Sequence, residues 1–172
     1  YYVLRPQGRT NYGELIQPTR PVPSDDTLVL TDLQGQRVQP NALKGQWLLV
    51  SVAGGACDAA CEQHLYQQRQ LREILGKDKD RIDRVWLVTD QAPVRPSLLP
   101  AMQQAWTLRA DPAAVARWLQ PAPGQPLSAH FYLVDPRGDW MMRYPAQADP
   151  VRIKKDLLRL MKASESWDKA GR

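Results

Sequence analysis

Three runs of apolar residues predict strands at the centre of a β-sheet. The runs cover residues 47–53, 85–89 and 131–135, and none of them alternates regularly between apolar and polar positions. A strand has such a continuous apolar pattern when both of its faces are covered. A fourth strand is predicted over 140–144, because Pro136-Arg-Gly138 supplies a turn directly after the third run.

Three further segments have the spacing of amphipathic helices. Between residues 62 and 76, apolar positions recur on one helical face and a glycine ends the pattern. Residues 112–119 form a shorter segment with Asp111 as its predicted N-cap. The last helix is expected to begin at Asp149-Pro150, since apolar residues then recur at i, i+4 and i+7.

The order of these elements predicts one α/β domain with a thioredoxin-like fold. A β-hairpin, residues 27–38, comes first, and a strand–helix–strand unit and a final antiparallel hairpin with its helix follow. We expect a central mixed sheet flanked by helices over residues 27–163. The proline-rich residues 1–26 are expected to be an extended lead-in, and residues 164–172 a frayed tail.

Composition and charge narrow the functional classes. The chain has 172 residues, 43% of them hydrophobic and 24% charged, as in ordinary globular domains. Its net charge of +5 is spread along the chain without a basic run, so no nucleic-acid partner is predicted. No apolar stretch is long enough to cross a bilayer. The start at Tyr1 instead of Met is compatible with a membrane anchor before this segment, or with an arbitrary boundary.

Cys57 and Cys61 are the only cysteines, and they lie where the first buried strand gives way to the first helix. Main-chain N–H groups at a helix N-terminus favour a thiolate. A thiolate is both the nucleophile of disulfide exchange and a ligand for Cu(I). A bridge across so short a loop adds little stability, so redox or metal chemistry is favoured over a structural role.

Several segments resemble the Sco/SenC family, and the resemblance spans roughly residues 27–162. It rests on the Cys-x-x-x-Cys pair, on residues 28–35, on 43–47 and on the strand-and-turn segment 132–138, with 11–15 similar to the family's lead-in. The resemblance implies a thioredoxin-fold protein that delivers copper to cytochrome c oxidase. It further implies a membrane-anchored protein at the periplasmic face of the bacterial inner membrane.

The resemblance also implies that copper is bound by Cys57, Cys61 and a histidine just before the third buried strand. Leu127 stands at the usual histidine position, and His130 lies closer to the strand as a candidate displaced ligand. The other histidine, His64, shares a helix face with leucines and is expected to be partly buried. Glu62 replaces a proline that usually follows the second cysteine.

Three functions therefore stay open. The first is copper binding for cytochrome c oxidase assembly, with the oxidase's copper-bearing subunit or another periplasmic copper or thiol protein as partner. The second is a metal-free thiol–disulfide oxidoreductase that reduces a partner's copper-site cysteines, in which Cys57 attacks and Cys61 resolves the mixed disulfide. The third is a docking module without chemistry of its own.

Overall fold

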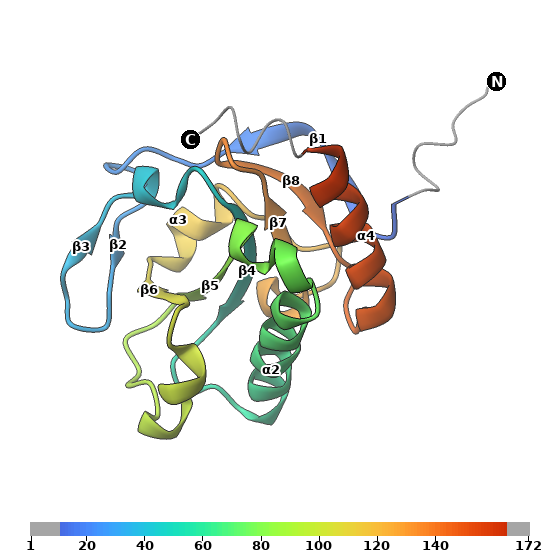
Figure 1. The fold of residues 1–172 in the computed structure, drawn as a ribbon. Coiled ribbons are helices and arrows are strands. Elements are labelled where there is room, and N and C mark those ends of the chain that lie inside the picture. Colours follow the sequence, from blue (N-terminus) through green and yellow to red (C-terminus); the bar gives the residue numbers. More distant parts are fainter. Residues whose placement is uncertain (1–10, 165–172) are drawn as a thin grey trace.

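An eight-stranded mixed sheet forms the centre of the molecule (Figure 1). The structure is a computed structural model, and it describes residues 11–164. The strand order is β1-β8-β7-β4-β5-β6-β2-β3. The strands are β1 (Glu14–Pro21), β2 (Leu30–Thr31), β3 (Arg37–Val38), β4 (Trp47–Ala53), β5 (Ile82–Val88), β6 (Trp106–Arg109), β7 (Tyr132–Val134) and β8 (Asp139–Arg143).

The helices cover both faces of this sheet. The α-helices are α2 (Ala59–Glu73), α3 (Pro112–Ala116) and α4 (Pro150–Ala163). Short 3-10 turns occupy Pro40–Leu43, Gly76–Arg81, Pro96–Leu98, Pro100–Met102 and Leu127–Ala129. Figure 1 shows α2 and α4 together on one face and α3 on the other.

The central strands have the pairing that the apolar runs predict. β4 runs parallel to β5 along its whole length and antiparallel to β7. Alternate side chains of β4 enter different cores. Leu48 and Val50 pack with Val115 of the α3 side, whereas Leu49 packs with Leu71 of α2 and helix α4. The thioredoxin-like fold and the N-terminal hairpin are confirmed.

The structure adds two strands that the sequence pattern does not reveal. β1 lies within the predicted lead-in and pairs with β8 at one end of the sheet. β6 follows the proline-rich loop and pairs in parallel with β5. Helix α2 also begins at Ala59, three residues earlier than predicted, because Asp58 serves as its N-cap.

Two expectations concern the chain ends. No helix among residues 11–164 is long and apolar enough to cross a membrane. Residues 1–10 of the predicted lead-in and residues 165–172 of the predicted frayed tail lie outside the described residues.

Candidate redox and metal site

The cysteine pair lies at the carboxyl end of the central strand β4, as the sequence predicts. β4 ends at Ala53, and a short loop leads through Cys57 into α2. Cys57 and Cys61 form a disulfide with an S–S distance of 2.10 Å and a Cα–Cα distance of 5.0 Å. The structure therefore shows the oxidised state of the pair.

Gly54 and Gly55 allow the loop after β5 to pack against the cysteine loop. A Cβ added to Gly55 would lie 2.2 Å from the carbonyl oxygen of Ala92. A Cβ added to Gly54 would lie 2.4 Å from a carboxylate oxygen of Asp90. Asp90 Oδ1 accepts hydrogen bonds from the main-chain N–H groups of Gly55, at 3.0 Å, and Ala92, at 3.1 Å. Asp90 thus joins the two loops.

The N-terminus of α2 is occupied by a carboxylate. Asp58 accepts a hydrogen bond from the N–H of Cys61 at 2.9 Å. Cys57 precedes this cap with a φ of 45°, in the left-handed region that non-glycine residues seldom adopt. One N–H group that could stabilise a thiolate is therefore already bonded to Asp58.

Arg95 joins the loop after β5 to the cysteine loop. Its guanidinium donates to the carbonyl oxygen of Cys57 at 2.5 Å and forms an ion pair with Glu62 at 2.5 Å. Glu62 is the residue that replaces the family's proline. The sequence does not single out Arg95, because no local pattern marks this arginine as a partner of the Cys57 carbonyl and of Glu62.

The two cysteines differ in exposure. Cys57 is 4% exposed and belongs to an apolar cluster with Trp86, Val88 and Met102. Cys61 is only partly buried and packs at the border of the same cluster. The cysteine nearer the chain start is therefore the more protected one.

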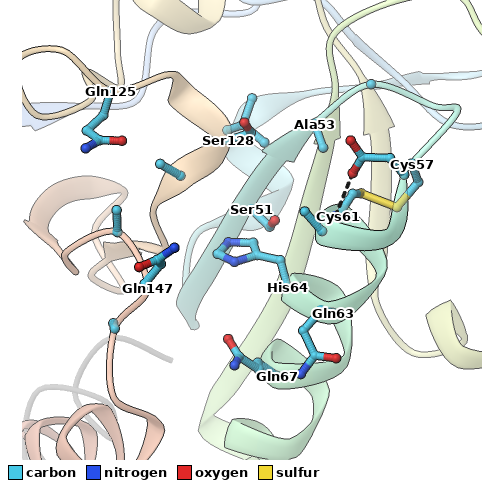
Figure 2. A pocket seen from close by; sticks show the side chains of 17 residues that line it. Ser51, Ala53, Cys57, Cys61, Gln63, His64, Gln67, Gln125, Ser128 and Gln147 are labelled. Carbon is cyan, nitrogen blue, oxygen red and sulfur yellow. Dashed lines mark hydrogen bonds between the residues drawn. A yellow bond between two sulfur atoms is a disulfide. The ribbon is translucent and has the colours of Figure 1, made fainter.

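A pocket of about 1040 Å³ opens beside the disulfide along α2 (Figure 2). Figure 2 shows Gln125, Ser128 and Gln147 across the pocket from α2. Among the described residues that line it, Asp58 is the only one with a formal charge. The lining residues are Ser51, Val52, Ala53, Gly54, Cys57, Asp58, Ala60, Cys61, Gln63, His64, Gln67, Gln125, Ser128, Ala129, Ala146, Gln147 and Ala148.

His64 lies in this pocket together with both cysteines. Its Nε2–H donates to the carbonyl oxygen of His130 at 3.1 Å, and its ring stacks on Phe131 with centroids 3.8 Å apart. Burial lowers the pKa of His64, although the hydrogen bond to His130 opposes that shift. The ring is therefore neutral near pH 7, and Nδ1 is its unprotonated nitrogen.

His130 is bonded to the main chain through both ring nitrogens. Nδ1–H donates to the carbonyl oxygen of Tyr144 at 2.8 Å, and Nε2 accepts from the N–H of Ala122 at 3.1 Å. The residue is 1% exposed and does not line the pocket. Burial lowers the pKa of His130 more than its bond to Tyr144 raises it.

The structure thus brings His64, and not His130, into the pocket of the two cysteines. Within residues 11–164 there is no group of three or more His, Cys, Asp or Glu side chains placed to hold a metal ion. The four glutamines of the pocket were not anticipated, since residues from α2 and two later loops meet only in the folded chain.

The chain belongs to the protein family described as "Transmembrane-like, thioredoxin-like, C-terminal domain", whose model matches residues 47–164. No curated protein sequence gives a significant match.

Solved structures of Sco proteins share the fold. Yeast Sco1 has a TM-score of 0.65 and 16% identity over 86% of this chain and 97% of its own. The apo Sco1 protein from Thermus thermophilus has a TM-score of 0.63 and 17% identity over 89% of this chain and 96% of its own. Copper-bound ScoI from Bradyrhizobium japonicum has a TM-score of 0.54 and 20% identity over 77% and 96%. The resemblance to the Sco/SenC family is therefore confirmed at the level of the fold.

Proposed function

We propose that this chain is a Sco-like protein that acts in copper-site assembly of a respiratory oxidase through Cys57 and Cys61. The main support is the placement of the pair at the end of β4 in a fold shared with copper-bound Sco structures. The partner is the oxidase's copper-bearing subunit, or another periplasmic copper or thiol protein.

The reduced pair has the chemistry that Cu(I) requires. Reduction converts the disulfide into two thiols on one turn of chain, and thiolate sulfur is a preferred ligand of Cu(I). The disulfide itself offers no thiolate, so reduction must come before copper loading. The neutral ring of His64 in the same pocket is a nearby nitrogen donor. His130 could join only after giving up its bond to Ala122 or Tyr144.

Anaerobic titration with Cu(I) tests this proposal. We expect the reduced protein to bind one equivalent tightly in competition with a Cu(I) chelator. The disulfide form and the doubly substituted Cys57→Ala, Cys61→Ala protein are the controls, and neither should compete. Weak binding by the reduced protein, or tight binding by the double variant, would exclude the pair as the copper site.

A second candidate is thiol–disulfide exchange with the partner's copper-site cysteines, without a metal of its own. The formed disulfide beside an open pocket favours it, as do the two main-chain bonds that occupy His130. The test mixes metal-free protein, in the presence of a chelator, with a peptide that carries a cysteine pair. Transfer of the disulfide between protein and peptide supports exchange. It is detected as a mass shift after alkylation of the free thiols. A reduction potential too low for any transfer contradicts it.

An extracytoplasmic location completes the proposal. A disulfide persists in oxidising compartments such as the bacterial periplasm and is rare in the cytosol. We propose that the full-length protein is anchored at the periplasmic face of the inner membrane. Fusion of a reporter enzyme that is active only in the periplasm to the full-length protein tests this location, and an inactive reporter would contradict it.

A further inference from the structure

We infer that a partner's sulfur reacts at Sγ of Cys61 and that Cys57 is the inner, resolving cysteine. This inference rests on the proposed function as a thiol protein and assigns the order of reaction within the pair. It is the reverse of the order expected from the sequence position of Cys57 before the helix.

The first argument is the different burial of the two sulfur-bearing residues. Cys57 is 4% exposed and packs against Trp86, Val88 and Met102, whereas Cys61 is partly buried. A thiolate must approach the sulfur that it attacks along the line of the breaking S–S bond. The greater burial of Cys57 therefore restricts that approach more than the partial burial of Cys61 does.

The second argument is the loop that flanks Cys57. Arg95 holds the carbonyl oxygen of Cys57 and the carboxylate of Glu62 at 2.5 Å each. Val94, next to Arg95, and Leu98 pack against the same apolar cluster. The loop after β5 therefore packs against the Cys57 side of the pair, while the pocket lies along α2 on the Cys61 side.

The third argument is the direction of the pocket. From the disulfide it extends along one face of α2, where Cys61, His64 and Gln67 follow at intervals of three residues. Figure 2 shows the pair at one end and the labelled glutamines on both sides. Both cysteines line the pocket, but Cys61 is the one that belongs to this helix face, where a partner segment in the pocket would lie.

The fourth argument concerns the expected advantage of Cys57. A helix N-terminus activates a cysteine through its unbonded N–H groups. Here Asp58 already accepts the N–H of Cys61 and places a carboxylate at the helix end. The Asp58 carboxylate therefore reduces the advantage that the helix N-terminus gives to a Cys57 thiolate.

The exchange then proceeds in two balanced steps. A partner thiolate attacks Sγ of Cys61, the Cys57–Cys61 bond breaks, and Cys57 leaves as a thiolate that takes up a proton. A second partner thiolate attacks the partner's own sulfur in the mixed disulfide and releases Cys61. The partner gains a disulfide and this chain gains two electrons. In the opposite direction Cys61 attacks a partner disulfide and Cys57 resolves the intermediate.

The test compares the two single-cysteine variants, Cys57→Ala and Cys61→Ala. Each is reacted with the aromatic disulfide dithiobis(nitrobenzoate) at neutral pH. We expect Cys61 in the first variant to react about tenfold faster than Cys57 in the second. The same reaction in denaturant is the matched control, and there the two rates should agree within about a factor of two. Equal rates in the folded proteins, or faster reaction of Cys57, would overturn the inference.

A second measurement does not depend on the variants' folding. Reduced wild-type protein is treated with a limiting amount of N-ethylmaleimide, and fragmentation mass spectrometry locates the label. We expect most of the label on Cys61, and a majority on Cys57 would overturn the inference. Because both tests use small reagents, their failure is distinct from failure of copper binding or of oxidase assembly.

Discussion

His130 shows how a residue suited to metal binding can instead be bonded to the main chain at both nitrogens. Replacing it by Ala removes both hydrogen bonds and leaves the N–H of Ala122 and the carbonyl of Tyr144 without this partner. We expect His130→Ala to lower the free energy of unfolding by about 2–3 kcal/mol, measured by urea denaturation.

Cu(II) binding separates this structural role from a ligand role. Cu(II) added to reduced protein should give a thiolate-to-copper charge-transfer band. We expect the band to keep its position and intensity in His130→Ala protein that circular dichroism shows to be folded. Loss of the band in that folded variant would establish His130 as a ligand. His64→Gln, which changes the histidine inside the pocket, is the matched comparison.

The two buried histidines also predict how stability depends on pH. Burial lowers both pKa values below 6.5, so below about pH 6.5 the unfolded chain binds more protons than the folded one. Arg143 adds to the lowering at His130 and Glu14 opposes it. The free energy of unfolding should therefore fall as the pH drops from about 7.5 to about 5.5.

Urea denaturation at the two pH values checks this expectation. The combined His64→Gln, His130→Asn variant is the control, and its stability should change less over the same range. Burial raises the pKa of Asp135, which acts in the opposite direction, and this residue is the same in both proteins, so its effect cancels in the comparison. If the stability of the double variant changed between the two pH values as much as that of the wild-type protein, the effect would belong to other groups.

At the scale of elements, Gln68 fixes α2 to the sheet. Its buried side-chain amide donates to the carbonyl oxygens of Leu49 in β4, at 2.7 Å, and Val85 in β5, at 3.0 Å. Gln68→Leu keeps most of the volume but removes both donors, so we expect a loss of about 1–3 kcal/mol in urea denaturation. Gln70→Leu, on an exposed position of the same helix, should change stability by at most about 0.5 kcal/mol.

The contact between the cysteine loop and the loop after β5 depends on two glycines in different ways. A Cβ at Gly55 would meet the main-chain oxygen of Ala92 at 2.2 Å, whereas one at Gly54 would meet the end of the Asp90 side chain at 2.4 Å. A side chain can turn away more readily than main chain. We expect Gly55→Ala to cost about 1–3 kcal/mol and Gly54→Ala less, measured by thermal unfolding. Equal costs would show that the Asp90 side chain cannot turn away.

The same scale shows why the sequence predicts some elements and not others. β4, β7 and the second half of β5 are apolar runs because both faces are covered, and this pattern is visible locally. β1 contains two prolines, which strands tolerate mainly at a sheet edge, and its partner β8 is distant in sequence. β6 has only one fully buried residue, Leu108, and owes its pairing to β5.

The candidate site is also only partly predictable from the sequence. The positions of Cys57 and Cys61 follow from the local change from strand to helix, and the sequence predicts them. The burial of Cys57, the contact with Arg95 and the pocket's glutamines arise from segments that meet only in the fold. Local sequence patterns predict where the two cysteines lie along the chain. The proposed order of reactivity within the pair depends on contacts between residues distant in sequence.

At the scale of the whole molecule, the first described residues are joined to the last helix beside the pocket. The buried carboxylate of Asp156 accepts the N–H groups of Tyr12 and Gly13, both at 2.9 Å. The hydroxyl of Tyr12 in turn accepts the N–H of Asp149 at 2.9 Å, next to pocket residues 146–148. The N-terminal segment therefore supports one wall of the pocket.

Removing the Asp156 carboxylate should loosen this wall together with the chain start. Asp156→Ala leaves two N–H donors without their acceptor, so we expect a loss of about 2–3 kcal/mol in urea denaturation. Hydrogen exchange should accelerate at the amides of Tyr12, Gly13 and Asp149. Lys155→Ala, at the exposed neighbouring position, is the control and should change stability by no more than about 0.5 kcal/mol. Unchanged exchange at Asp149 in a destabilised Asp156→Ala protein would show that the chain start and the pocket wall are independent.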